Sequence, residues 1–273
     1  MKKSRGELEY IEVSNTLSSI KIALQGAHIF DFSVKGKKPL LYLSERARFE
    51  KGIPIRGGVP ICWPWFGPHP SDQNLPNHGF ARISIWEHLL TQEISPEKTK
   101  IIMVLRSSPQ SLKYWPFHFE LKLEILISDR LELRLITKNT DEKDFAFSQA
   151  LHSYLLIDNI HTTQLHGLDK TSYYNKVNNT HDNLQKGSLS FTQEVDRVYH
   201  GVEGSLLLKD HEVKTIGSQT VVIWNPGKEL VKKMPDLSSY EDMLCIESAS
   251  GLENEIILTP SSTHTLKSVL TQT

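Results

Sequence analysis

The sequence has little cysteine and no excess charge, and each shortage excludes a class of protein. Among 273 residues only Cys62 and Cys245 are cysteines. A pair so far apart indicates neither a disulfide framework nor a zinc site of the CxxC kind. With 31 basic and 32 acidic residues the formal net charge is −1, which gives no electrostatic footprint for nucleic acid. We therefore expect no nucleic-acid partner.

Long apolar runs are also missing. No uninterrupted apolar segment approaches the roughly 18 residues that span a bilayer. The first residues, MKKSRGELEY, carry positive charge but no apolar run follows them, so they do not match a secretory signal. We expect a cytoplasmic protein with no membrane partner.

The chain contains no Gly/Ser-rich or Pro-rich linker, no low-complexity tract and no internal repeat of regular period. A solenoid or propeller is therefore not indicated. Hydrophobic residues make up 38% of the chain and charged residues 23%, which allows a substantial core. We expect a single β-sandwich domain over residues 1–273.

Short runs with alternating apolar and polar residues are the main pattern in the sequence. The runs that fit half-buried strands cover residues 20–24, 100–105, 118–128, 130–139, 205–210 and 220–225. The third and fourth flank a Ser-Asp-Arg turn, which predicts a hairpin. Helical patterns of 10–15 residues do not alternate with the strands, so a doubly wound parallel sheet is disfavoured. We predict an all-β protein, a large antiparallel β-sandwich, with short helical pieces near 229–242.

The stretch from Ile55 to Arg82 is unusually dense in polar and aromatic residues for a connecting loop. Arg56 and Arg82 carry planar, permanently charged guanidinium groups that suit phosphate or carboxylate oxygens. Aromatic side chains that could stack against a pyranose face are Trp63, Trp65, Phe66 and Phe80. The plainer alternative makes these aromatics core residues and pairs the arginines with surface carboxylates. The combination favours a sugar-phosphate pocket, because binding residues concentrate on loops held by a rigid scaffold.

Three further residues could carry chemistry, and each has a plainer explanation. His152 lies in a strand-like run, where it could border a pocket or be a core histidine with a satisfied hydrogen bond. Glu247 follows a short apolar run, and burial at such a place can raise the pKa of a carboxylate. Asp196 could accept hydrogen bonds from sugar hydroxyls or pair with its neighbour Arg197.

A histidine and a glutamate suit proton transfer on a neutral sugar. Opening the ring at the anomeric carbon requires a base for the O1 proton and an acid for the ring oxygen, and each contributes about 10²–10⁴-fold. We expect activity to fall on the acid side as Glu247 is protonated and on the alkaline side as His152 loses its proton.

Six separated motifs share their order and spacing with a known family. They are RGGVPICWPWFG (56–67), HGFAR (78–82), ALHSYL (150–155), EVDRVY (194–199), WNPGKELVKKMPDL (224–237) and MLCIESA (243–249). With these motifs the chain resembles the hexose-6-phosphate mutarotase (glucose-6-phosphate 1-epimerase) branch of the aldose 1-epimerases. The resemblance implies a galactose-mutarotase-like β-supersandwich that interconverts the α and β anomers of a hexose 6-phosphate, its small-molecule partner.

The resemblance also implies roles for individual residues. His152 matches the family's general acid toward the ring oxygen, and Glu247 matches the general base on the anomeric hydroxyl. The binding residues that it implies are Arg56 and Arg82 for the phosphate, Asp196 for the sugar, and His78 close to the sugar. Asn77 stands where many relatives have a substrate-contacting Gln, and Gly227 stands where an aromatic residue is common.

Two other functions remain open from the sequence. One is a sugar-phosphate-binding protein without turnover, since folds host unrelated functions. The other is a mutarotase for free aldoses, in which Arg56 and Arg82 would be structural. We expect no cofactor and no metal, because the mechanism needs neither and His78, His152, His161 and His166 show no HExxH-type spacing. We also expect a monomer.

Overall fold

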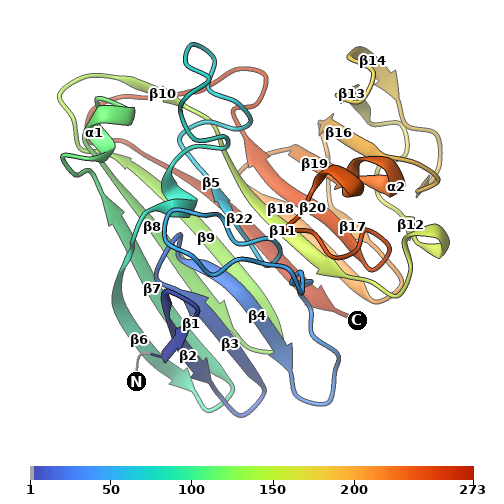
Figure 1. Cartoon of the computed structure of the whole chain (residues 1–273), viewed down its shortest axis with the longest axis horizontal. Coiled ribbons are helices and arrows are strands. Elements are labelled where there is room, and N and C mark those ends of the chain that lie inside the picture. The colour runs from blue at the N-terminus through green and yellow to red at the C-terminus, as the bar shows by residue number, and fades with distance from the viewer. Residues whose placement is uncertain (1–2) are drawn as a thin grey trace.

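The structure, a computed structural model, describes residues 3–273 and consists mainly of antiparallel strands (Figure 1). The predicted all-β antiparallel class is confirmed. The helical segments within these residues are short: η1 (Ala81–Ile83), α1 (Ser111–Tyr114), η2 (Ile160–Thr162), α2 (Gly227–Leu230) and η3 (Val231–Lys233). None of them is long and apolar enough to cross a membrane.

Two seven-stranded sheets form most of the structure. Sheet I has the order β14 (Thr180–Leu184), β13 (Ser172–Asn175), β16 (Val195–His200), β19 (Thr220–Asn225), β20 (Met243–Ser250), β11 (Gln149–Leu156) and β5 (Ile61–Cys62). Sheet II has the order β17 (Ser205–Leu207), β18 (His211–Ile216), β22 (Thr263–Gln272), β9 (Arg130–Asn139), β8 (Phe119–Ile127), β7 (Lys98–Arg106) and β6 (Glu87–Ser95).

A smaller sheet and two strand pairs complete the fold. Sheet III joins β1 (Lys3–Arg5), β2 (Leu8–Ser14), β3 (Ser18–Ala23) and β4 (His28–Val34) in sequence order. The pairs are β10 (Phe145–Phe147) with β21 (Ile256–Leu258), and β12 (Gln164–Leu165) with β15 (Leu189–Ser190). Strand β3 contacts β8, and β20 contacts β22 and β18. Sheet II is therefore shared by two layers, with sheet III over one part and sheet I over another (Figure 1).

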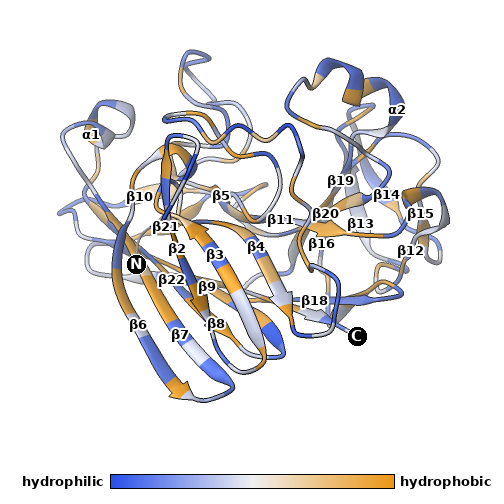
Figure 2. Cartoon of the chain, turned by 60° about the horizontal axis from the view of Figure 1, so that its bottom comes forward, coloured by the Kyte–Doolittle hydropathy of each residue, from blue (hydrophilic) through white to orange (hydrophobic). Residues whose placement is uncertain are grey.

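The predicted hairpin forms between β8 and β9. From Phe119 to Ile127 every second residue is buried, and the residues between them are half-buried. Strand β9 repeats the pattern, with Leu131 opposite Ile127 and Leu135 opposite Leu123. Figure 2 shows the resulting mixture of apolar and polar bands along the strands of sheet II. Period-two alternation is the pattern expected of a sheet with one face on the core.

Sheet I differs, because its central strands are buried on both faces. All residues of β20 are buried. Leu244 and Ile246 belong to the main core, whereas Cys245 lies in a separate cluster on the opposite face. Glu247 shares that face with Cys245, since successive residues of a strand alternate sides. A carboxylate buried in this way needs a chemical reason.

The segment predicted to hold helical pieces near 229–242 is helical only at its start. Helix α2 and the 3₁₀ turn η3 end at Lys233, and no regular helix follows up to β20. Pro235 contributes to this end, because the residue before a proline avoids the helical conformation. Met234 accordingly has φ −113° and ψ 86°.

Gly79 gives a stability prediction. It has φ +74°, and a Cβ there would lie 2.0 Å from the carbonyl oxygen of Trp63. Gly67 has a similar φ of +78° but nothing within 4 Å of its Cβ position. Alanine at either position costs about 1–2 kcal/mol for the left-handed backbone, and Gly79→Ala adds a clash with backbone. We expect Gly79→Ala to lower Tm by much more than Gly67→Ala in thermal unfolding, and equal shifts would contradict this packing.

Candidate active site

His152 and Glu247 lie directly opposite each other on β11 and β20. The Nε2 atom of His152 is 3.3 Å from Oε1 of Glu247. Their exposed fractions are 8% and 1%, so bulk water does not screen the pair. The two residues that the sequence suggested for proton transfer therefore form one unit.

Burial opposes charge on both members of this pair. It lowers the pKa of His152 well below 6.5, and electrostatic interactions with His78, Arg82 and Arg56 lower it further. Burial also raises the pKa of Glu247 well above 4.5, with a contribution from Asp196 that Lys176 and Arg82 partly offset. With no ligand bound, the pair therefore favours the form in which His152 is neutral and Glu247 holds the proton.

Several buried polar atoms at this place have no partner. They are Nδ1 of His152, Oε2 of Glu247 and Nε of Arg82. Buried polar groups are nearly always hydrogen-bonded, so each exception calls for an explanation. Three such atoms from three different elements indicate a site built to bind a polar molecule.

His78 lies beside the pair in a strained conformation. Its φ is +62°, and its Nδ1 accepts a hydrogen bond of 3.2 Å from the backbone N–H of Gly67. Burial, followed by the charge of Arg82, holds the pKa of His78 well below 6.5. The neutral ring therefore carries its hydrogen on Nε2 as a donor. The ring centroid is 6.0 Å from that of His152, so His78 lies beside the pair of His152 and Glu247.

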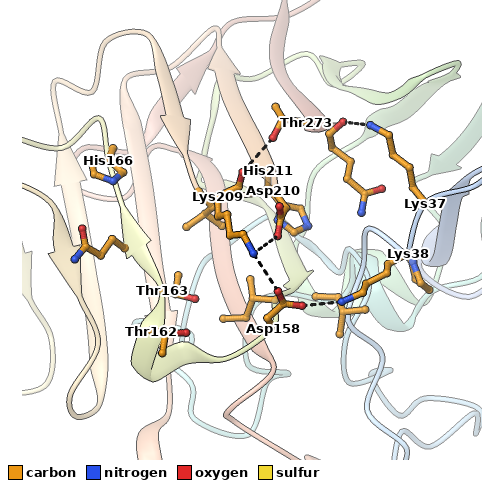
Figure 3. A pocket seen from close by; sticks show the side chains of 16 residues that line it. Lys37, Lys38, Asp158, Thr162, Thr163, His166, Lys209, Asp210, His211 and Thr273 are labelled. Carbon is orange, nitrogen blue, oxygen red and sulfur yellow. Dashed lines mark hydrogen bonds and ion pairs between the residues drawn. The ribbon is translucent and has the colours of Figure 1, made fainter.

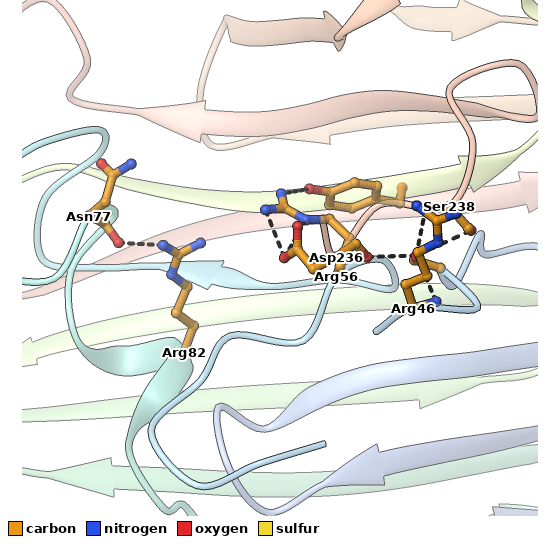
Figure 4. Close-up of polar contacts among 8 residues, drawn as sticks. Arg46, Arg56, Asn77, Arg82, Asp236 and Ser238 are labelled. Atoms are coloured by element: carbon orange, nitrogen blue, oxygen red, sulfur yellow. Dashed lines mark hydrogen bonds and ion pairs between the residues drawn. The ribbon is translucent and has the colours of Figure 1, made fainter. Parts of the chain in front are cut away.

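The two arginines suggested by the sequence have different surroundings (Figure 4). Arg56 donates from Nε to Asp236 at 3.1 Å and from Nη1 to the Tyr154 hydroxyl at 3.0 Å. Burial acts to lower the pKa of Arg56, but Tyr154 and Asp236 together raise it. The positive charge of Arg56 is therefore already compensated inside the protein.

Arg82 has no such compensation. Its Nη2 donates to the backbone oxygen of Asn77, and its Nε has no partner. Within residues 3–273 no carboxylate forms an ion pair with Arg82, and burial lowers the pKa of its guanidinium. The Asn77 side chain is exposed, and its amide group points away from Arg82 (Figure 4). Arg82 is thus a desolvated cation without a counterion, which favours binding of an anion.

Asp196 lies on β16, on the same side of sheet I as Glu247. Its Oδ2 is 3.0 Å from Nζ of Lys176. The pairing with Arg197 considered from the sequence is wrong, because Arg197 instead donates to Gln185 at 3.2 Å. Neighbouring residues of a strand point to opposite faces, which separates Asp196 from Arg197.

The aromatic walls suggested by the sequence are mostly wrong. Trp63, Trp65 and Phe80 have exposed fractions of 0%, 4% and 1% and belong to the main core. Phe66 alone of the four is half-buried, with its ring centroid 4.7 Å from that of His78. The sequence did not show which aromatic residues of this loop are buried, because the loop forms no long strand with alternating burial.

Tyr154 and Trp224 form an aromatic wall that the sequence reasoning missed. The rings of His152 and Tyr154 stack with centroids 4.8 Å apart, and Trp224 lies edge-on at 6.1 Å from each. The two-residue spacing of His152 and Tyr154 could have placed both on one face of β11. Gly227 cannot carry a side chain, since its φ is +61° and a Cβ would lie 2.7 Å from the backbone nitrogen of Glu194.

The two cysteines lie on the same face of sheet I as His152 and Glu247, and both are free and buried. Burial raises the pKa of Cys62 to about 12 and that of Cys245 well above 9.0. Thiols of this kind are unreactive, because the thiolate is the nucleophile. In the described part of the chain, no group of three His, Cys, Asp or Glu side chains could hold a metal ion.

A separate cleft of about 900 Å³ lies at the end of β11 and beside β18 (Figure 3). None of the predicted site residues lines it. Asp158 sits between two of its lysines, 2.8 Å from Lys38 and 3.7 Å from Lys209. The charges of this cleft therefore compensate one another, in contrast to Arg82, although Nε2 of His211 and Oε1 of Gln272 have no partner.

Similarity to known proteins agrees with the geometry. The family model for aldose 1-epimerase matches residues 9–271. This chain belongs to the aldose 1-epimerase family.

Two relatives of this aldose 1-epimerase are named "putative glucose-6-phosphate 1-epimerase". The protein from Escherichia coli K12 is 32% identical over 272 residues, which covers 96% of this chain and 90% of the relative. The one from Salmonella typhimurium LT2 is 34% identical over 251 residues, or 89% and 83% of the two chains.

Solved structures confirm the fold of this aldose 1-epimerase. A crystal structure of a "putative mutarotase" from Salmonella typhimurium has a TM-score of 0.92 at 30% identity, covering 99% of this chain and 92% of that one. A galactose mutarotase-like protein from Clostridium acetobutylicum has a TM-score of 0.76 at 13% identity, covering 100% and 98%. The predicted galactose-mutarotase-like sandwich and the family are thus both confirmed.

Membership of the aldose 1-epimerases assigns the chemistry of this chain as interconversion of sugar anomers. The structure brings His152, Glu247 and His78 together. It places Arg82, Arg56 and Asp196 close enough to influence the charge of the pair. Asn77 contacts Arg82 through its backbone oxygen.

Proposed function

We propose that this aldose 1-epimerase interconverts the α and β anomers of a hexose 6-phosphate. The observation that carries the proposal is the uncompensated guanidinium of Arg82 beside the buried pair of His152 and Glu247. A phosphate on C6 would supply the missing counterion and would hold the sugar with its anomeric carbon over the pair. The names of the relatives support the same substrate class.

His152 and Glu247 would share one proton through the reaction. In the charged form, Glu247 takes the proton from O1 while His152 gives its proton to the ring oxygen. The C1–O5 bond breaks, an aldehyde forms at C1, and the pair is left neutral. O1 and the ring oxygen are bonded to the same carbon, so two groups 3.3 Å apart can serve both.

The open-chain sugar then rotates about the C1–C2 bond. The C5 hydroxyl attacks the other face of the aldehyde, His152 recovers the proton from that hydroxyl, and Glu247 returns its proton to O1. The neutral form of the pair is the one favoured by burial in the empty site. Burial thus stabilises the protonation state that the pair has while the open-chain sugar is bound.

The remaining groups would hold the sugar. The Nε2–H of His78 is a donor suited to a hydroxyl or ring oxygen. Tyr154 and Trp224 give an apolar wall next to His152. Arg56 would add to the positive field felt by the phosphate, although Asp236 compensates most of its charge.

The pH dependence follows from the shared proton. The active pair holds one proton, so activity falls when it gains a second proton or loses its only one. The second proton would go to His152, whose pKa is lowered, and the last proton would leave Glu247, whose pKa is raised. We therefore expect a bell-shaped profile of kcat/KM with its acid limb below pH 6.5. His152 controls the acid limb and Glu247 the alkaline limb, which is the reverse of the assignment expected from the sequence.

The profile would be measured by polarimetry with the uncatalysed rate subtracted at each pH. Phosphate itself titrates near pH 6, so glucose 6-sulfate, whose charge is constant, serves as the control substrate. A profile that is flat from pH 4 to pH 9 with both substrates would contradict the shared-proton mechanism.

The substrate is tested by comparing freshly dissolved α-glucose 6-phosphate with α-glucose. We expect kcat/KM to be about 100-fold higher for the phosphorylated sugar, since charge-assisted hydrogen bonds to the uncompensated guanidinium of Arg82 contribute about 1.5–3 kcal/mol. Equal values would make the protein a mutarotase for free aldoses. Binding of glucose 6-phosphate without turnover would make it a sugar-phosphate-binding protein.

A further inference from the structure

Lys176 lies at the site without a role in the mechanism above. It directly follows β13, and its backbone N–H donates to the backbone carbonyl oxygen of Asp196 at 2.8 Å. Its Nζ is 3.0 Å from Oδ2 of Asp196 and 5.5 Å from the ring centroid of Phe66. The side chain of Lys176 thus crosses from the sheet toward the loop that carries His78.

The strand register places this ion pair on the side of Glu247 away from His152. Asp196 pairs with Trp224, and Trp224 pairs with Cys245. Asp196 on β16 is therefore separated from β20 by β19, and it is level with Cys245, two residues along β20 from Glu247. Strands 4.8 Å apart and a rise of 3.4 Å per residue separate the Cα atoms of Asp196 and Glu247 by about 12 Å. With both side chains reaching inward, a pyranose ring fits between the two carboxylates.

The geometry of the sugar decides which atoms meet the ion pair. In a hexose 6-phosphate the phosphate-bearing carbon is attached beside the ring oxygen, whereas C2 and C3 lie on the other side of the anomeric carbon. With the ring oxygen at His152 and O1 at Glu247, the C2 and C3 hydroxyls face β16. The phosphate then lies away from Lys176 and Asp196.

We propose that Lys176 is a further substrate-binding residue, and this rests on the proposed function. Together with Asp196, which the family resemblance already implies as a sugar-binding residue, it forms a hydroxyl-binding pair for the C2–C3 edge of the sugar. Each hydroxyl can donate and accept, so the carboxylate accepts from one and the ammonium donates to its neighbour. The exposed fractions of their side chains, 33% for Lys176 and 20% for Asp196, leave both groups open to a ligand. Lys176 is a substrate-binding residue that also positions Asp196.

The pair has a second, electrostatic consequence. The groups that influence or contact the Glu247 carboxyl are His152 on β11, Cys62 on β5, Cys245 on β20, Tyr154 on β11, Asp196 on β16, Lys176 after β13 and Arg82 in η1. The charge of Asp196 raises the pKa of Glu247, and that of Lys176 lowers it. Removing one partner must therefore shift the pH profile in one direction, and removing the other must shift it in the opposite direction.

Three variants test the proposal: Lys176→Met, Asp196→Asn and the double variant. We expect each single variant to raise KM and the Kd for glucose 6-phosphate about tenfold, the loss of one hydrogen bond to a charged group. Lys176→Met should move the alkaline limb of the pH profile, which Glu247 controls, up by about half a unit, and Asp196→Asn should move it down by a similar amount. The double variant should regain the wild-type profile but keep the raised KM.

Deoxy sugars identify the contacted edge. With 2-deoxy- or 3-deoxyglucose 6-phosphate, the tenfold penalty of Lys176→Met should shrink to less than twofold for the sugar that lacks the contacted hydroxyl. Lys138→Met, on the exposed side of β9, is the matched control and should behave as wild type. Wild-type KM, Kd and pH profile in Lys176→Met would overturn the proposal.

Binding measurements separate this proposal from the proposed function. If the wild type binds glucose 6-phosphate without turnover, the proposed function fails, and a raised Kd in Lys176→Met would still support the hydroxyl-binding pair. If the wild type accelerates anomerisation and Lys176→Met is unaffected, the hydroxyl-binding pair alone fails.

Discussion

Replacing Glu247 with glutamine is expected to lower kcat for glucose 6-phosphate anomerisation by about 10²–10⁴-fold, the usual contribution of a general acid or base. The amide keeps the size of the carboxyl group but cannot accept the O1 proton. His152→Asn should have an effect of the same size, since the two groups share one proton across 3.3 Å. Polarimetry from freshly dissolved α anomer gives both rates.

The double variant tests whether the two residues act as a unit. Once one member is missing, the other has no proton to exchange, so the combined loss should be much smaller than the product of the single losses. His211→Asn is the matched control, because His211 is buried at 4% exposure but lines the separate cleft. Wild-type rates in both Glu247→Gln and His152→Asn would contradict the mechanism.

The second large effect is expected for Arg82→Ala. It should lower kcat/KM for glucose 6-phosphate about 100-fold but change that for glucose only a few-fold, because the uncompensated charge of Arg82 has no partner in a neutral sugar. Arg82→Lys should retain part of the selectivity, as it keeps a charge but loses the planar fork. Initial rates with both sugars over a range of concentrations provide the comparison.

Arg56→Ala separates phosphate binding from structural support. Removal of Arg56 leaves Asp236 and the Tyr154 hydroxyl without their partner, so we expect a lower Tm and a loss of activity shared by both sugars. If Arg82→Ala also lost equal activity on glucose and glucose 6-phosphate, the proposed role of Arg82 in phosphate recognition would be wrong.

Patterns within single elements allowed much of the fold to be predicted. The β8–β9 hairpin follows from alternate apolar residues on either side of a tight turn, because one face of the sheet meets the core. The limited helix after residue 229 was less predictable, since α2 and η3 depend on local turns and a following proline. Strand order within the sheets depends on contacts between distant segments, which local patterns do not encode.

The site could be predicted only in part for the same reason. His152 and Glu247 were chosen from their chemistry and from the family motifs, but their direct opposition comes from the register of β11 and β20. Arg56 and Arg82 looked equivalent until Asp236, 180 residues from Arg56 in sequence, proved to compensate only one of them. Lys176 had no distinguishing pattern, because its hairpin shows no regular alternation of apolar and polar residues.

NMR exchange spectroscopy on an equilibrium mixture of α- and β-glucose 6-phosphate tests the central claim most directly. It detects transfer of magnetisation between the two anomeric protons and needs no coupling enzyme. We predict exchange well above the blank with the wild-type protein, and exchange at the level of the blank with Glu247→Gln at the same concentration. Exchange that stays at the blank with the wild type, or persists unchanged in Glu247→Gln, would contradict the claim that this buried pair interconverts the anomers of a hexose 6-phosphate.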